Sequence, residues 1–274
     1  MAFSIKEIIR QVREVLSEQG VATEDIQKME QQIQDRINSV EPPTIAIIGF
    51  TGVGKSSTLN ALFNAGQETS DVRACTQEAK QFSGNLEPYT GKKGVVNIYD
   101  MPGLGESIVK DRIHYEVYAK ILPTVDVIIW AFHAEDRAMT PMQNALLTLI
   151  EKIGPNFTQK LLFAVNKADA IAPGESAWND RFNVPSNEQK QNLADFESYI
   201  RERVHEVLPL WNGPIVCYSA KRRYHLDQLM TAMVDLMPKD KKWILNNLAD
   251  IADYTELVDP EYLEYIRSMA REIH

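Results

Sequence analysis

The chain has 274 residues, a formal net charge of −9 and a hydrophobic content of 44%. This length allows one large domain or one domain with a smaller unit, and the hydrophobic content is sufficient for a sizeable core. The acidic balance argues against generic binding to nucleic acid or to an anionic membrane face, because both partners attract basic surfaces.

The two ends of the chain predict helices. Apolar residues recur at helical spacing over residues 4–18 and 24–39, so residues 1–40 predict a helical hairpin that turns near Gly20. Residues 239–274 predict a C-terminal helical extension, in which Asp259-Pro260 is a typical helix start. We expect the terminal segments to form one unit, since each carries an apolar stripe. Separate docking of each segment is the alternative.

Residues 41–238 predict an α/β domain. Short apolar runs, typical of strands buried on both faces, alternate with helical patterns. We therefore expect a mostly parallel six-stranded sheet with helices on both faces, and an antiparallel edge strand at 81–85. The predicted strands are 44–48, 81–85, 95–99, 125–132, 161–165 and 215–218.

A glycine-rich loop follows the first of these strands. Residues 49–56, Gly-Phe-Thr-Gly-Val-Gly-Lys-Ser, fit the P-loop pattern G-x-x-x-x-G-K-[ST] between a strand and a helix. Backbone N–H groups and the helix N-terminus would bind phosphates. Lys55 would reach the β- and γ-phosphates, and Ser56 would bind Mg²⁺. The predicted nucleotide-binding residues here are Gly49, Thr51, Gly52, Val53, Gly54, Lys55, Ser56 and Ser57.

Two further motifs indicate guanine as the base. The segment 166–169, Asn-Lys-Ala-Asp, follows an apolar strand and resembles the N-K-x-D motif. Its Asp169 carboxylate can accept two hydrogen bonds from guanine, whereas adenine has no such donor pair. The segment 219–221 follows the next strand and resembles the S-A-K motif, whose backbone N–H contacts the guanine 6-oxo group. The predicted base-binding residues are Asn166, Lys167, Asp169, Ser219, Ala220 and Lys221.

The segment 100–103, Asp-Met-Pro-Gly, ends another strand and resembles the D-x-x-G motif. Asp100 would hold Mg²⁺ through water, and the Gly103 N–H would sense the γ-phosphate. Thr76 is our candidate for the switch threonine that ligates Mg²⁺ only when GTP is bound, and Thr69 is the alternative. The predicted metal ligands are thus Ser56, Thr76 and Asp100.

The five motifs occur in the order of translation-factor-related GTPases. The run 52–63 resembles the Era/TrmE/septin side of that class, and segments 121–130 and 134–138 resemble bacterial YfjP/YeeP-type GTPases. The resemblance covers roughly residues 41–238. It implies a Ras-like P-loop G domain, GTP or GDP as ligand, Mg²⁺ and a cytoplasmic bacterial setting. The flanking helices are not covered by it.

Two departures from related enzymes concern catalysis. Leu104 stands where Ras-like enzymes carry a water-positioning glutamine, so we expect slow intrinsic hydrolysis. Gly52 stands where potassium-activated relatives carry asparagine, which argues against potassium activation. Arg73 precedes Thr76 by three residues, the spacing of the built-in arginine finger of Gα proteins, although a solvated loop arginine is the alternative. The predicted catalytic residues are Lys55, Arg73, Thr76 and Gly103.

These features predict a slow nucleotide-controlled switch that hydrolyses GTP and acts on a cytoplasmic partner such as ribosome assembly. A dynamin-like or septin-like GTPase, whose flanking helices mediate self-assembly or membrane association, is the alternative. The partners would be a protein effector or a second copy bound through the switch face, without sequence-specific nucleic acid.

The basic cluster 221–223 is interpreted as a solvated surface. Cys75 and Cys217 fit neither a metal site nor a disulfide framework, and no signal peptide is expected, which favours a cytoplasmic location with peripheral membrane association as the alternative.

Overall fold

The computed structural model describes residues 3–4, 10, 13–14, 16–18, 20–39, 41–63, 73–74, 79–85, 95–135, 138–239, 241 and 248–249. The chain divides into two compact units. Pro43–Met237 form the larger unit, and Met1–Pro42 together with Pro238–His274 form the smaller one.

The larger unit is built on one sheet with the strand order β3-β4-β5-β2-β6-β7-β8. Its five strands from β5 to β8 are parallel, and β4 is antiparallel to both of its neighbours. The six predicted strands are confirmed. An additional two-residue strand, β3, lies outside β4, so β4 is not at the edge. The strands are β2 (Thr44–Gly49), β3 (Arg73–Ala74), β4 (Lys80–Asn85), β5 (Val95–Asp100), β6 (Val127–His133), β7 (Leu161–Asn166) and β8 (Ile215–Cys217).

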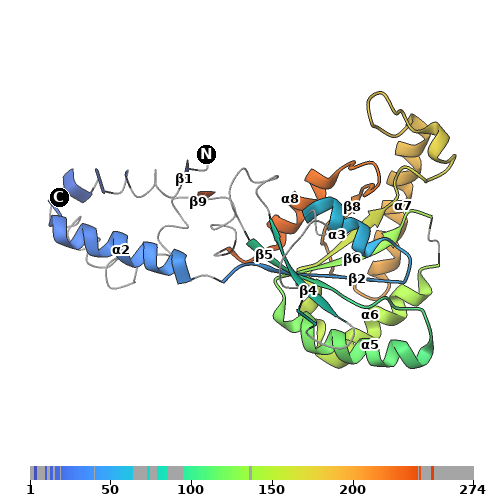
Figure 1. Cartoon of the computed structure of the whole chain (residues 1–274), viewed down its shortest axis with the longest axis horizontal. Coiled ribbons are helices and arrows are strands. Elements are labelled where there is room, and N and C mark those ends of the chain that lie inside the picture. Colours follow the sequence, from blue (N-terminus) through green and yellow to red (C-terminus); the bar gives the residue numbers. More distant parts are fainter. Residues whose placement is uncertain are drawn as a thin grey trace. The chain divides into compact units, whose positions relative to one another are not determined.

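Helices cover both faces of this sheet because its central strands carry apolar side chains on both sides. On one face α5 (Ile108–Ile121), α6 (Thr140–Ile153) and α7 (Asn187–His205) enclose the main hydrophobic cluster. On the other face lie α3 (Lys55–Phe63) and α8 (Leu226–Leu236) (Figure 1). The 3-10 turns are η1 (Leu122–Thr124), η2 (Pro155–Lys160) and η3 (Glu175–Ala177). The predicted α/β architecture is confirmed.

The smaller unit contains the predicted second helix, α2 (Thr23–Ser39). The Arg13 guanidinium donates to the Glu30 carboxylate of this helix, with an Nε–Oε1 distance of 2.7 Å. Two short segments differ from the expected helices, because β1 (Phe3–Ser4) and β9 (Leu248–Ala249) pair as antiparallel strands. Each strand supplies partners for backbone groups of the other.

The rest of the predicted first helix and of the C-terminal extension lies outside the described residues, so the boundaries 1–40, 41–238 and 239–274 stay predictions. No helix in the described part of the chain is long and apolar enough to span a bilayer.

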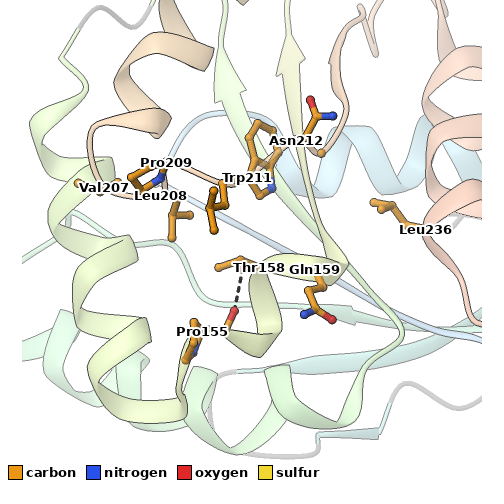
Figure 2. A pocket seen from close by; sticks show the side chains of 11 residues that line it. Pro155, Thr158, Gln159, Val207, Leu208, Pro209, Trp211, Asn212 and Leu236 are labelled. Atoms are coloured by element: carbon orange, nitrogen blue, oxygen red, sulfur yellow. Dashed lines mark hydrogen bonds between the residues drawn. The ribbon is translucent and has the colours of Figure 1, made fainter.

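A cavity of about 540 Å³ lies where β7 and β8 begin (Figure 2). Its wall includes the Trp211 ring, and the Thr158 hydroxyl beside it donates to the Pro155 carbonyl at 2.7 Å. The predicted nucleotide motifs follow the opposite, carboxyl ends of the strands, so this cavity is separate from them. Its lining residues are Pro155, Thr158, Gln159, Val207, Leu208, Pro209, Leu210, Trp211, Asn212, Gly213 and Leu236.

Candidate functional site

The sequence motifs gather along the carboxyl edge of the sheet. Gly49 ends β2, Asp100 ends β5 and Asn166 ends β7, while Ser219 follows β8 closely. Ligands of open α/β sheets bind at this edge, so the fold brings the phosphate, metal and base motifs to the expected place.

Glycine is required at two P-loop positions by close contacts. A Cβ atom on Gly49 would lie 2.5 Å from the Ala131 carbonyl oxygen, and one on Gly54 would lie 2.4 Å from Nδ2 of Asn166. Both glycines, like Gly52, have a positive φ that other residues rarely adopt. This backbone leads directly into the first turn of α3, whose N–H groups form an anion-binding end.

The Lys55 side chain folds back onto the P-loop backbone. Its ammonium donates to the carbonyl oxygens of Gly49 at 3.2 Å and Phe50 at 3.1 Å. Burial lowers the pKa of Lys55, and the nearby carboxylates of Asp100 and Glu106 oppose that effect. The lysine is therefore placed to exchange its carbonyl contacts for phosphate oxygens.

Two of the predicted metal ligands are in direct contact. The Ser56 hydroxyl donates to Oδ2 of Asp100 at 2.9 Å. A hydroxyl and a carboxylate are oxygen donors of the kind that Mg²⁺ prefers, usually together with water and substrate phosphates. The described residues include no group of three or more His, Cys, Asp or Glu side chains that could hold a metal by themselves. The pair therefore fits a magnesium ion that is shared with a nucleotide.

The structure gives little or no position for three of the predicted catalytic or metal-binding candidates. Thr76 and its alternative Thr69 lie outside the described residues. Arg73 lies in β3 with its backbone opposite Gln81, rather than in a loop.

Asn166 connects the phosphate and base motifs. Its Nδ2 donates to the Val53 carbonyl at 3.1 Å, and its Oδ1 accepts from the amides of Lys167 at 2.8 Å and Ala220 at 3.1 Å. The P-loop, N-K-x-D and S-A-K segments thus share one buried amide side chain. The Ala220 N–H of the S-A-K segment therefore donates to Asn166 in this structure.

The Asp169 carboxylate is buried, with 1% of the residue exposed. Its Oδ1 has no hydrogen-bond partner among the described residues, and its Oδ2 lies 3.7 Å from Nε of Arg222. A buried acceptor without a partner is costly, so this atom fits a ligand that donates hydrogen bonds, such as guanine.

Arg222 corrects one part of the sequence interpretation. The cluster 221–223 was expected to be solvated, but Arg222 is partly buried and pairs with both Asp169 and Asp180. Lys221 is exposed, as expected, and its ammonium lies 2.7 Å from the Glu175 carboxylate.

The D-x-x-G segment lies directly against the P-loop. A Cβ atom on Gly103 would lie 2.4 Å from Oγ1 of Thr51 and 3.0 Å from Nζ of Lys55. The Leu104 amide donates to the Gly49 carbonyl at 3.1 Å, and the Thr51 amide donates to the Leu104 carbonyl at 2.9 Å. The Leu104 side chain is packed into the core with 1% exposed.

Sequence reasoning missed the side chains that support these motifs. The buried Gln189 amide donates to carbonyl oxygens at the end of the N-K-x-D motif and just after it, including that of Asp169 at 3.2 Å. Asp111, His114 and Tyr118 of α5 bind main-chain atoms at or just after the D-x-x-G motif. Their only signal in the sequence is helical spacing.

Comparison with known proteins agrees with this geometry. The family model described as 50S ribosome-binding GTPase matches residues 44–167. YfjP of Escherichia coli strain K12 is 31% identical over 214 residues, which cover 77% of this chain and 68% of YfjP. The chain belongs to the 50S ribosome-binding GTPase family. It is accordingly a P-loop GTPase that binds guanine nucleotide and hydrolyses GTP.

Solved structures show the same fold at low sequence identity. Toc33 from Arabidopsis thaliana in complex with GDP and Mg²⁺ has a TM-score of 0.53 and 15% identity, and the match covers 76% of this chain and 91% of that one. The LeoA bacterial dynamin GTPase from ETEC has a TM-score of 0.52 and 15% identity. That match covers 94% of this chain and 45% of LeoA.

Proposed function

We propose that this GTPase is a slow nucleotide-controlled switch that acts on a cytoplasmic partner in ribosome assembly. The observation that carries the proposal is the state of Leu104. This residue is buried and is tied to the P-loop through both its amide and its carbonyl. A buried leucine cannot orient the water that attacks the γ-phosphate, so the GTP-bound state would persist until a partner supplies the missing group.

The chemistry would consist of positioning and charge stabilisation. Lys55, the P-loop amides and the Gly103 N–H would bind the β- and γ-phosphate oxygens. Ser56 and Asp100, with Thr76 in the GTP state, would hold Mg²⁺, which would neutralise charge that develops on the phosphates. The hydroxyl–carboxylate contact between Ser56 and Asp100 supports this assignment, as does the Mg²⁺ in the Toc33 complex.

Base selection would depend on Asp169, with Asn166 fixing the surrounding loops. Lys167 would pack its stem on the base, and the segment 219–221 would border it. The partnerless Oδ1 of Asp169 supports this role, because GTP offers donors that ATP lacks at that edge.

An exposed apolar surface next to the switch supports a protein partner. On α5, which follows the D-x-x-G motif directly, Ile108, Val109 and Ile113 are 76%, 68% and 49% exposed. Several large exposed apolar side chains on one helix are typical of an interaction site. The net charge of −9 disfavours bare RNA, so we propose that a ribosomal or assembly-factor protein binds this surface.

The direct test combines kinetics with sedimentation. Intrinsic single-turnover hydrolysis of GTP should be slow, and added ribosomal subunits should accelerate it. The protein should sediment with the subunits when a non-hydrolysable GTP analogue is bound and should remain in the supernatant with GDP. Lys55→Ala removes the ammonium proposed to bind the phosphates, so this variant serves as a control that is expected not to bind nucleotide. Equal sedimentation in both nucleotide states would contradict the switch.

A dynamin-like GTPase is the second candidate. The match to LeoA covers 94% of this chain, so it includes most of the residues outside the unit Pro43–Met237. In this alternative the terminal unit, in which β1 pairs with β9, would mediate self-assembly or membrane association. GTP-dependent sedimentation with liposomes, or without any partner, would favour it over the ribosomal switch.

A further inference from the structure

Helix α5 holds the D-x-x-G region with three side chains on one of its faces. Asp111, His114 and Tyr118 are spaced i, i+3 and i+7, so they share one side of the helix. The Gly105 amide donates to Oδ1 of Asp111 at 2.9 Å. His114 Nδ1 lies 2.9 Å from the Gly103 carbonyl, and the Tyr118 hydroxyl donates to the Pro102 carbonyl at 2.6 Å.

Both peptide groups that flank Gly103 are held by these contacts. In the peptide between Gly103 and Leu104, the carbonyl accepts from His114 and the amide donates to Gly49 at 3.1 Å. In the peptide between Pro102 and Gly103, Tyr118 binds the carbonyl. The two peptides contain one further polar group, the Gly103 N–H, which has no hydrogen-bond partner among the described residues.

The direction of this N–H follows from peptide geometry. The C=O and N–H of a trans peptide point in opposite directions within one plane. Because the Pro102 carbonyl points to Tyr118, the Gly103 N–H points away from that hydroxyl. Gly103 itself borders the P-loop, where an added Cβ would lie 3.0 Å from Nζ of Lys55.

The donor character of both side chains is fixed by their surroundings. Tyr118 is fully buried, and burial raises the pKa of its hydroxyl, which therefore keeps its proton. A carbonyl oxygen only accepts hydrogen bonds, so the proton in the contact with Gly103 is on Nδ1 of His114.

We propose that Tyr118 and His114 are positioning residues for GTP recognition, because they orient the Gly103 N–H toward the γ-phosphate. The inference rests on the role proposed above for Gly103 and adds the residues that fix its peptide planes. Removal of either side-chain donor would let the Gly103 peptide rotate. GTP would then lose a hydrogen bond that GDP, which has no γ-phosphate, never makes.

The test compares affinities for GDP and for a non-hydrolysable GTP analogue in the full chain. Tyr118→Phe removes only the hydroxyl, which also accepts from the backbone N–H of Gly49 in the P-loop. We therefore expect the loss of affinity for the analogue to be about ten-fold larger than the loss for GDP. Tyr115→Phe is the matched control, since this neighbouring tyrosine packs edge-on against Tyr118 at a centroid distance of 6.4 Å. It should leave both affinities unchanged.

A second ring variant and one measurement on the wild-type protein keep the result decisive. His114→Phe keeps a ring and removes the Nδ1 donor, so it should show the same selective loss even if Tyr118→Phe folds poorly. The underlying role of Gly103 is tested by the NMR resonance of its amide in the wild-type protein, because an added Cβ at this position would collide with the P-loop. If that resonance differs between the GDP-bound and analogue-bound states but both ring variants lack the selective loss, the positioning role is overturned and the role of Gly103 stands. If the resonance is the same in both states, both fail. Equal loss of GDP and analogue affinity in the ring variants would indicate a structural role only and would overturn the proposal.

Discussion

At the residue scale, we propose that the choice of base depends on the buried carboxylate of Asp169. Asp169→Asn inverts the donor and acceptor pattern at this position, so GTP should lose two charge-assisted hydrogen bonds and xanthosine triphosphate should bind better than GTP. Each such bond contributes about 1.5–3 kcal/mol, which predicts a loss of GTP affinity of at least ~10²-fold. Competition between the two nucleotides measures this change.

The control for this exchange is Asp180→Asn. Asp180 is exposed and shares Arg222 with Asp169, but it has no predicted contact to the base. Its exchange should change GTP affinity little. If wild-type protein bound ATP as tightly as GTP, the assignment of Asp169 would be contradicted.

Arg73 had two open roles, an arginine finger in cis or a solvated side chain, and the position of its backbone in β3 argues against the finger. Strand β3 lies two strands from β5, which leads to Gly103, and this is roughly 10 Å at the usual strand spacing. We therefore expect Arg73→Ala to change single-turnover hydrolysis at saturating GTP less than two-fold. A ten-fold fall with unchanged GTP affinity would instead establish the finger.

The sequence was informative about single residues where a motif has fixed spacing, as with the contact of Ser56 and Asp100. It could not identify residues that act through contacts from elsewhere in the chain. Arg222 pairs with Asp169 although the two residues are 53 positions apart in the sequence (222 − 169 = 53). It lies in a basic cluster whose composition is typical of a solvated surface. Tyr118 was missed because an apolar helix face predicts packing and gives no sign of the carbonyl that its hydroxyl binds.

At the element scale, long apolar runs predicted the strands well. Strands β6 and β7 were predicted within about two residues of their bounds, because few other elements combine short length with continuous apolar character. Strand β3 was missed, since two residues, Arg73 and Ala74, carry no periodicity. Strand β4 was correctly predicted as antiparallel. Its predicted position at the edge of the sheet was wrong, because the missed strand β3 lies outside it.

Helix α5 carries a prediction about partner binding. The double exchange Ile108→Asp with Val109→Asp should abolish GTP-dependent sedimentation with ribosomal subunits, because two charges would replace its exposed apolar surface. Affinities for GDP and the GTP analogue should stay within about two-fold, since both side chains are exposed and lie at the start of α5, outside the P-loop. Sedimentation equilibrium of the same variant shows whether a dimer is lost as well.

The matched control for this surface is Leu210→Asp. Leu210 is 97% exposed and lines the cavity at the amino ends of β7 and β8. It should not affect sedimentation. If Leu210→Asp disrupted binding and the α5 variant did not, the partner surface would lie at that cavity and the assignment to α5 would be wrong.

At the scale of the whole molecule, all described motif residues lie within the unit Pro43–Met237. Its first residue has a structural role, because the Asn97 amide donates to the Pro43 carbonyl at 2.8 Å. We expect residues 43–237 alone to fold and to bind GDP as tightly as the full chain. Failure of this fragment to fold would contradict the proposed G-domain boundaries.

Removal of only the N-terminal part should have the opposite outcome. Deletion of residues 1–42 removes β1, the partner of β9, while residues 238–274 remain attached. We also expect this deletion to expose the apolar stripe that the sequence predicts for the C-terminal segment. Unpaired strand edges and apolar stripes cause association, so this variant should aggregate or elute as an oligomer, whereas the 43–237 fragment should elute as a monomer. Size-exclusion chromatography and thermal melting measure both. A monomeric deletion variant with an unchanged Tm would show that the two ends do not depend on each other, and the terminal segments would then be separate appendages of the G domain.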